Sequence, residues 1–229
     1  ALVRRGEVDR FLFAADDLII AVGQDGLVAN VAKYLEGQPV LGINPAPDRF
    51  DGVLLHGSAE HLGKTLRAIA AHDCGLERRT MAEARLDTGE TLLALNELFV
   101  GHRSHQSARY LIDTGSAQEP QSSSGLIVAT GTGATGWARS IMEATAASLQ
   151  LGIEEEALGY FVREPFPSIS TGTSVRSGKL VAGALALQSR MNEGGVIFAD
   201  GIEQDFLAFE WGRQLKVGVS SRKLCLVRP

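Results

Sequence analysis

A short stretch near the start of the chain, residues 16–31, constrains the fold more than any other part of the sequence. Five apolar residues, 18–22, follow one another without polar alternation, which is typical of a strand covered on both faces. The run ends at Gly23-Gln24-Asp25-Gly26, and small and apolar residues then resume in a helical pattern. Strand, glycine turn and helix together present backbone N–H groups to a phosphate. An Asp in such a turn suits a general base or a metal ligand, although Asp-Gly is also ordinary turn chemistry.

The residues after this turn predict a β-α-β unit. A second short strand is expected at residues 39–44, so residues 16–44 indicate a parallel sheet with a right-handed crossover. A clear amphipathic helix follows at residues 58–73, with Ser58 as its N-cap. Because a parallel unit normally has neighbours on both sides of its first strand, we expect an opening β-α unit to be missing.

After Gly75 the sequence changes to short strand-like runs separated by turns such as Asp87-Thr88-Gly89. One helix is expected among them, at residues 137–150, and residues 118–124 are interpreted as a polar loop. The sequence therefore predicts an α/β domain with a parallel sheet at residues 1–75. A strand-rich, β-sandwich-like domain follows at residues 76–229, with C-terminal strands that return to the first domain. The expected strands are residues 78–86, 91–100, 108–113, 126–130, 179–187, 195–199, 204–210, 213–219 and 223–227.

Charge and hydropathy exclude several classes of partner. The net charge of the 229 residues is −5, which argues against a broad surface for nucleic acid or anionic membrane. No apolar run reaches the roughly 18 residues of a membrane span. The N-terminus lacks a signal-peptide pattern, so a cytoplasmic protein is expected.

Cysteines and histidines give no metal site. Cys74 and Cys225 lie far apart, without zinc spacing or a disulfide framework, and are interpreted as buried free thiols. His102 and His105 share a predicted loop, but no set of partners completes a metal cage.

A second glycine-rich segment occupies residues 126–137. Its Gly131, Gly133 and Gly136 have G-x-G-x-x-G spacing after a strand and before a helix, and residues 154–156 supply acids near the expected ~20-residue offset. This pattern supports a dinucleotide-binding oxidoreductase. The loop also contains Thr130, Thr132 and Thr135, whose hydroxyls suit contacts to phosphate, ribose or base. A third interpretation is that the segment only forms the entry to a helix, with an N-cap.

A third signal is the pair Asn96-Glu97 within the apolar strand expected at residues 91–100. One of the two side chains is expected to point inward, where a buried amide or carboxylate needs partners. The hydroxyls or amide of a ligand would supply them. A polar pair at a strand edge is the alternative.

The three motifs in this order resemble the NAD kinase family, and the details are most similar to the branch that includes the mitochondrial-type NAD kinase. The motifs are Gly23-Gln24-Asp25-Gly26, Asn96-Glu97 and residues 130–137, and the resemblance covers residues 16–229. It implies the NAD kinase/diacylglycerol kinase-like fold. The sequence departs from the family pattern at Gln24, where the family has glycine, and at Gly131, where the main branch has proline. It also departs at Ser124, where many members have Asp.

The resemblance implies transfer of a phosphoryl group from ATP, or from polyphosphate, to the 2′-hydroxyl of the adenosine ribose of NAD, which gives NADP. Asp25 would be the base. Backbone N–H groups of residues 23–26 and Mg²⁺ would hold the phosphates. The implied cofactor-binding residues are Gly23, Gln24, Gly26, Asn44, Asn96, Glu97, Thr130, Thr132, Thr135, Gly136, Trp137 and Ser140.

The resemblance also implies a homodimer. Three other functions remain open from the sequence. These alternatives are an oxidoreductase that uses residues 131–136 for NAD(P), a related lipid or sugar kinase, and a nucleotide-binding protein without activity.

Overall fold

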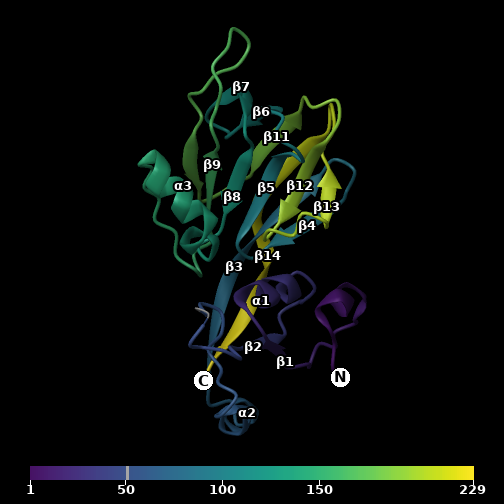
Figure 1. Ribbon diagram of the computed structural model, residues 1–229, viewed down its shortest axis with the longest axis vertical. Helices are drawn as coiled ribbons and strands as arrows, with labels where there is room; N and C mark the ends of the chain where they lie inside the picture. The colour runs from purple at the N-terminus through teal and green to yellow at the C-terminus, as the bar shows by residue number, and fades with distance from the viewer. Residues whose placement is uncertain (50–51) are drawn as a thin grey trace. The chain divides into compact units, whose positions relative to one another are not determined.

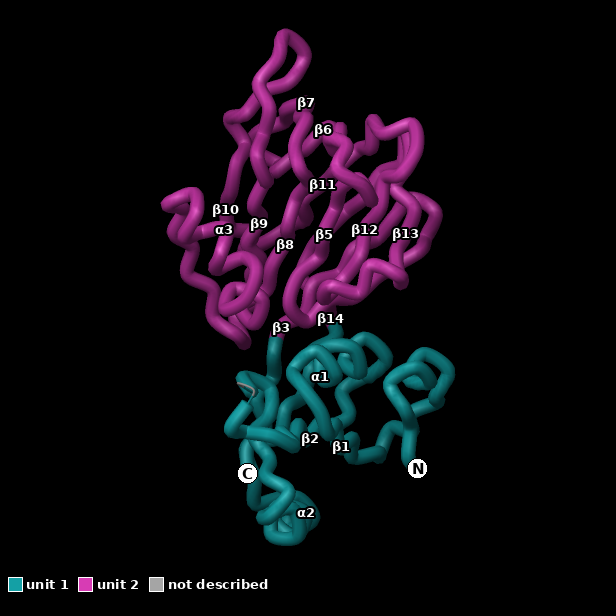
Figure 2. Tube along the Cα trace, in the orientation of Figure 1, with its two compact units in different colours: residues 1–79, 222–229 teal, residues 80–221 magenta. Residues whose placement is uncertain are grey.

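The structure is a computed structural model that describes residues 1–49 and 52–229. The chain divides into two compact units, which Figure 2 shows in different colours: residues 1–79 with 222–229 (unit 1), and residues 80–221 (unit 2). Two strands, β3 (Gly75–Leu86) and β14 (Gln214–Arg228), have residues in both units.

Unit 1 contains the predicted β-α-β unit. Strands β1 and β2 pair in parallel, with Ile20 opposite Leu41, and the end of β14 pairs in parallel with β2. The helix between β1 and β2 is α1, and the three strands lie in the order β1-β2-β14 (Figure 1). The elements of this unit, besides the ends of β3 and β14, are η1 (Arg5–Arg10), β1 (Ile19–Val22), α1 (Asp25–Ala32), β2 (Pro39–Ile43) and α2 (Leu62–Ala70).

Two details of unit 1 differ from the sequence predictions. Strand β1 is not covered on both faces: Ile20 and Val22, which point to one face, are 38% and 56% exposed, whereas Ala21 on the other face is 4% exposed. The strand also lies at the edge of the sheet. Helix α2 begins after His61 instead of at Ser58, and the Ser58 hydroxyl contacts the His61 ring at 3.5 Å. The apolar run therefore indicated a strand correctly but not its place in the sheet.

Unit 2 is built from two sheets. In one sheet the strands are hydrogen-bonded in the order β14-β11-β6-β7. Strand β3 pairs with β14 in the same sheet, and β4 pairs with β3. The other sheet has the order β10-β9-β8-β5-β12-β13 and is antiparallel throughout. The strands that lie wholly in this unit are β4 (Thr91–Ala94), β5 (Glu97–His102), β6 (Ala108–Asp113), β7 (Gln118–Ser123), β8 (Leu126–Ala129), β9 (Leu158–Val162), β10 (Ser177–Leu180), β11 (Leu185–Ser189), β12 (Gly195–Ala199) and β13 (Phe206–Ala208).

Several boundaries in unit 2 also differ from the predictions. The polar loop expected at residues 118–124 is largely strand β7, which pairs with β6 at the edge of its sheet, where a proline such as Pro120 is tolerated. Strand β9 was not expected. The helix expected at residues 137–150 is α3 (Trp137–Thr145), preceded by η2 (Gly133–Thr135), and Ala146 ends it in the left-handed conformation.

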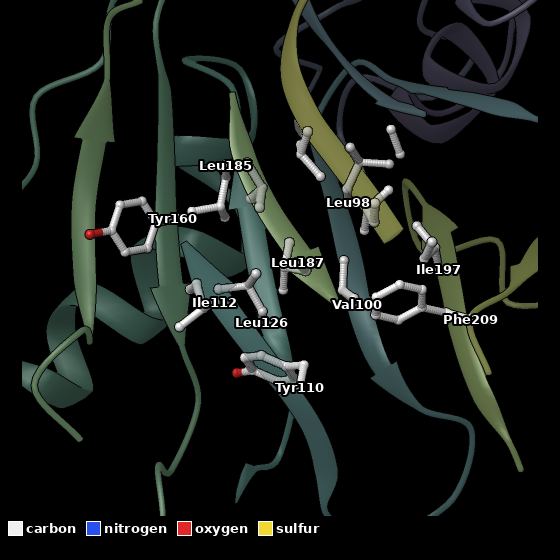
Figure 3. Close-up of a cluster of buried hydrophobic side chains, with 14 of the residues drawn as sticks. Leu98, Val100, Tyr110, Ile112, Leu126, Tyr160, Leu185, Leu187, Ile197 and Phe209 are labelled. Carbon is white, nitrogen blue, oxygen red and sulfur yellow. The ribbon is translucent and has the colours of Figure 1, made fainter. Parts of the chain in front are cut away.

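The main hydrophobic core lies between the two sheets of unit 2 (Figure 3). Tyr110 and Leu187 come from one sheet, and Val100, Leu126 and Ile197 come from the other; all five are at most 3% exposed. A second core in unit 1 is centred on β2 and the end of β14. The predicted fold class, a parallel α/β part with a strand-rich part, is therefore confirmed.

In the described part of the chain, none of the helices combines the length and the apolar character needed to cross a bilayer.

The core between the sheets predicts the effect of a truncation. Leu185 is fully buried, so Leu185→Ala removes apolar contacts and leaves a cavity, and the free energy of unfolding is expected to fall by about 2–5 kcal/mol. Urea denaturation measures the loss. The control is Val181→Ala, a position that is 67% exposed, where a change within about 0.5 kcal/mol is expected. Equal losses in both variants would contradict this assignment of the core.

Candidate functional site

In unit 1, the glycine turn leads from β1 directly into α1, of which Asp25 is the first residue. Gln24 is the N-cap residue and has φ −90° and ψ 166°, an extended conformation that any residue adopts. The departure from glycine at this position therefore does not strain the turn. The Gly23 N–H was expected to hold a phosphate, but it donates to the Ile43 carbonyl at 3.1 Å and so extends the pairing of β1 with β2.

The Asp25 carboxylate is held by a loop that the sequence did not associate with it. Oδ2 accepts the Val53 N–H and Oδ1 accepts the Leu54 N–H, each at 3.0 Å. A carboxylate has about four acceptor positions, so two remain for a ligand. Asp25 is half-buried, and its orientation is set by backbone groups.

Asn44 lies beside the same loop, at the end of β2. Its Oδ1 accepts the Ala46 N–H at 3.0 Å, and a Cβ added at Gly52 would lie 3.3 Å from its Nδ2. The loop packs closely on β2, because the Leu54 carbonyl would lie 2.2 Å from a Cβ at Gly42. The structure thus brings Asp25, which follows β1, and Asn44, which follows β2, against the same loop at residues 52–54.

In unit 2, Asn96 lies in the bend that joins β4 to β5 and Glu97 is the first residue of β5, so the pair does not lie within one continuous strand. The Asp200 carboxylate accepts the N–H groups of Leu95, Asn96 and Glu97 at 3.1, 2.7 and 3.3 Å. Asp200 has φ 54°, and its own N–H donates to the Glu97 carbonyl at 3.0 Å. Asp200 was not among the predicted site residues, because an Asp before a glycine is ordinary turn chemistry.

Thr130 connects this bend to the glycine-rich loop. Its hydroxyl donates to the Leu95 carbonyl at 2.5 Å and accepts the N–H groups of Thr132 and Gly133 at 3.1 and 3.2 Å. The Thr130 N–H donates to the Asn96 carbonyl at 2.9 Å. The hydroxyl of this fully buried residue therefore has all three of its hydrogen-bonding positions filled by the backbone.

Two glycines of this loop lie directly against backbone carbonyl groups of other segments. A Cβ at Gly133 would lie 2.1 Å from the Asn96 carbonyl oxygen, and one at Gly131 would lie 2.1 Å from the Gly152 carbonyl oxygen. Strand β8, which precedes the loop, is antiparallel to both of its neighbours, so the loop does not belong to a βαβ unit. Glu155, one of the acids proposed for a ribose, accepts the Gly152 N–H and pairs with Lys179 at 2.6 Å. The oxidoreductase hypothesis is therefore not supported.

The remaining predicted residues of this loop lie near the start of α3. The Thr135 hydroxyl donates to the Thr132 carbonyl at 2.9 Å, and Gly136 is the residue before the helix. Trp137 stacks on Phe99 with ring centroids 6.1 Å apart. Ser140 is exposed on the first turn of α3.

Trp137 also faces a groove of about 610 Å³ in unit 2. The Arg163 guanidinium lies 5.3 Å from the centre of the Trp137 ring, which is the geometry of a cation–π contact. Ser124, the position at which the family often has Asp, lines the same groove, as do His102 and His105. The groove therefore offers an aromatic surface beside cationic and polar groups.

Glu97 is the titratable group that its surroundings perturb most clearly in this region. It is 9% exposed, and burial, with the nearby Asp200 carboxylate as a smaller cause, raises its pKa to about 7. Near neutral pH the Glu97 carboxyl group is therefore present in both protonation states, as a donor in one and an acceptor in the other.

Within the described residues, His, Cys, Asp and Glu form no group of three that could hold a metal ion. Cys225 is buried and Cys74 is half-buried, and both are free thiols.

The chain is similar to known proteins in both fold and sequence. No family model matches the sequence. The chain is similar in fold to yeast NADH kinase in complex with NADH, with a TM-score of 0.72 at 18% identity over 93% of this chain and 62% of the yeast chain. It is also similar to an NAD kinase from Archaeoglobus fulgidus in complex with ATP, with a TM-score of 0.69 at 22% identity over 96% of this chain and 79% of that chain.

Two curated relatives are more informative in sequence. The mitochondrial NAD kinase 2 of Rattus norvegicus is 29% identical over 196 residues, which cover 65% of this chain and 46% of the relative. The NAD kinase of Caldicellulosiruptor saccharolyticus is 31% identical over 221 residues, which cover 93% of this chain and 76% of the relative. With the three motifs in order and the shared fold, this similarity shows that the chain belongs to the NAD kinase family.

Proposed function

We propose that this protein transfers the γ-phosphoryl group of ATP to the 2′-hydroxyl of the adenosine ribose of NAD, which gives NADP and ADP. The observation that carries the proposal is the Asp25 carboxylate at the N-terminus of α1, oriented by the N–H groups of Val53 and Leu54. Membership of the NAD kinase family supports the same reaction.

Asp25 is the proposed general base. The 2′-hydroxyl is a poor nucleophile while it is protonated, so a carboxylate within hydrogen-bonding distance accelerates its attack on phosphorus. The ribose oxygen forms a bond to the γ-phosphorus, the bond from that phosphorus to the ADP oxygen breaks, and Asp25 accepts the hydroxyl proton. Its unused acceptor positions are available for this step, because the two backbone N–H groups fill only part of its capacity.

A divalent cation is proposed to enter with the nucleotide. Mg²⁺ is proposed to bind as a complex with ATP, largely through phosphate oxygens, as it commonly does in nucleotide sites. When bound, Mg²⁺ offsets the negative charge of the phosphates. Asn44, beside the loop that holds Asp25, is the proposed polar contact for this end of the nucleotide.

The residues of unit 2 are proposed to bind NAD. Asn96 and Glu97 would hold the adenine or the ribose hydroxyls. Their backbone N–H groups donate to the Asp200 carboxylate, which fixes the backbone that carries these side chains. The remaining proposed contacts come from the glycine-rich loop and the start of α3: Thr132, Thr135, Gly136, Trp137 and Ser140. Thr130 is proposed to shape the loop instead of touching NAD, because its hydroxyl is fully bonded to the backbone.

A homodimer in the cytoplasm is the proposed state of the protein, by resemblance to its family. Light scattering after gel filtration tests the oligomeric state. A monomer at the concentration of the activity assay would contradict the homodimer.

The reaction itself is tested by incubating the protein with ATP, Mg²⁺ and NAD and measuring NADP. Formation of NADP that requires both ATP and protein is expected. Polyphosphate in place of ATP tests the alternative donor. The absence of NADP with either donor, in protein that is folded by circular dichroism, would contradict the proposed function.

Asp25→Asn is expected to lower kcat at least ~100-fold, because the amide cannot accept the hydroxyl proton, while the affinity for NAD changes little. Steady-state kinetics and calorimetry of NAD binding measure the two effects. Asp73→Asn, an exposed position in the same unit, is the control and should retain wild-type kinetics. Near-normal kcat in Asp25→Asn would show that Asp25 is not the base.

Glu97 predicts a dependence of stability on pH. The folded state keeps the Glu97 proton up to a pKa of about 7, whereas the unfolded state loses it near 4.5, so wild-type stability falls as the pH rises through this range. Glu97→Gln does not titrate. Its stability relative to the wild type is expected to rise by up to about 3 kcal/mol between about pH 5 and pH 8, measured by urea denaturation.

The exposed Glu90 supplies the control for this measurement. Glu90→Gln should change the stability by the same small amount at both pH values. If the difference between Glu97→Gln and the wild type is also independent of pH, burial of Glu97 does not raise its pKa.

A further inference from the structure

We infer that Arg79 is a positioning residue for Asp25, and that it acts through the peptide group that joins Val53 to Leu54. The inference rests on the proposed function, in which Asp25 is the base. All four residues lie in unit 1.

The peptide group between Val53 and Leu54 contacts Arg79 through its carbonyl and Asp25 through its N–H. Arg79 Nη2 donates to the Val53 carbonyl at 3.3 Å, and the N–H of the same peptide, which belongs to Leu54, donates to Asp25 Oδ1 at 3.0 Å. The preceding peptide supplies the Val53 N–H to Oδ2, also at 3.0 Å. A guanidinium, a peptide and a carboxylate thus form a continuous chain of hydrogen bonds.

The guanidinium at the start of this chain is deeply buried and fixed. Arg79 is 2% exposed, and its Nε donates to the buried Glu77 carboxylate, which also accepts the Arg228 guanidinium. Burial opposes ionisation of Glu77, but the hydrogen bonds from Arg228 and Arg79 outweigh it and hold its pKa below the usual value. Glu77 is therefore a carboxylate that holds Arg79 in place from within the same strand.

His56 lies close enough to this cluster for its pKa to respond to it. Burial, and then the charge of Arg228, lower the His56 pKa, with Arg79 adding to the decrease, while Glu77 and Asp25 oppose it. The lowered pKa favours the neutral imidazole of His56. The positive charge at the Val53 carbonyl is that of Arg79, whose guanidinium donates to this carbonyl.

A positive charge on the carbonyl side of a peptide strengthens its N–H as a donor, because hydrogen bonds in a chain polarise one another. The contact also prevents the 53–54 peptide from rotating, so the Leu54 N–H stays directed at Asp25. A buried ion pair contributes little net stability, because desolvation offsets the attraction between the charges. The role that fits Arg79 is therefore to fix the geometry of the loop and, through it, the carboxylate.

The test compares Arg79→Lys and Arg79→Ala with wild type in the NAD phosphorylation assay. A misplaced base lowers the rate of the chemical step, so kcat is expected to fall roughly 10- to 100-fold, with KM for NAD within about threefold of wild type. Lysine keeps the charge but cannot bind Glu77 and the Val53 carbonyl as a planar fork, so it should restore little. Guanidinium chloride, at concentrations that leave wild-type activity unchanged, should restore part of the kcat of Arg79→Ala.

Two controls separate positioning from stability. Val227→Ala leaves a cavity in the core of unit 1 and is expected to lower the thermal midpoint without a large change in kcat. Arg222→Gln removes a more exposed guanidinium that pairs with Glu36 in the same unit, and its kcat should not respond to guanidinium.

The outcomes are distinct. The inference is overturned if either Arg79 variant keeps kcat within twofold of wild type, or if guanidinium fails to restore activity to Arg79→Ala. It is also overturned if KM for NAD rises in proportion to the fall in kcat/KM. Failure of the wild type itself to form NADP would instead contradict the proposed function.

Discussion

The backbone N–H groups that two aspartates bind are the interactions on which the candidate site depends. In unit 2, the Asp200 carboxylate accepts three consecutive N–H groups, from Leu95 to Glu97, and this closes the bend between β4 and β5. Thr130 then binds both carbonyls of the bend, at Leu95 and Asn96. The glycine-rich loop is therefore built on a bend that Asp200 holds, and Gly133 is required because its backbone lies against the Asn96 carbonyl.

In unit 1, too, an aspartate carboxylate binds backbone N–H groups, but here they orient the carboxylate itself. Asp25 accepts two N–H groups from a loop nearly thirty residues later in the chain, so a residue of the glycine turn is oriented by a distant segment. The Asp200 carboxylate binds three consecutive backbone N–H groups, whereas Asp25 starts a helix, binds two backbone N–H groups and retains acceptor capacity. This difference is the physical reason to regard Asp25 as the reactive carboxylate and Asp200 as its structural counterpart in the other unit.

The sequence predicted the parts of this fold that depend on local pattern. The turn at Asp25 and the parallel β1-α1-β2 unit follow from an apolar run, a glycine turn and the spacing after it. The exposure of one face of β1 could not be predicted, because an apolar run does not reveal which of its faces another element covers. Strand β7 has a polar sequence, and its pairing with β6 decides its conformation. The role of Asp200 depends on contacts across about a hundred residues, which no local pattern records.

The glycine-rich loop has the spacing of a dinucleotide-binding motif, but its glycines are required for another reason. Gly131 and Gly133 occur at dinucleotide-binding spacing, yet both are required by carbonyl oxygens of the protein that would lie 2.1 Å from a Cβ. Gln24, in contrast, occupies a position where glycine is usual in the family, and its extended backbone needs no glycine. A glycine position is therefore informative only when the group that approaches it is known. By that criterion the turn at Asp25 tolerates a side chain at position 24, whereas the loop beside Asn96 tolerates none at position 133.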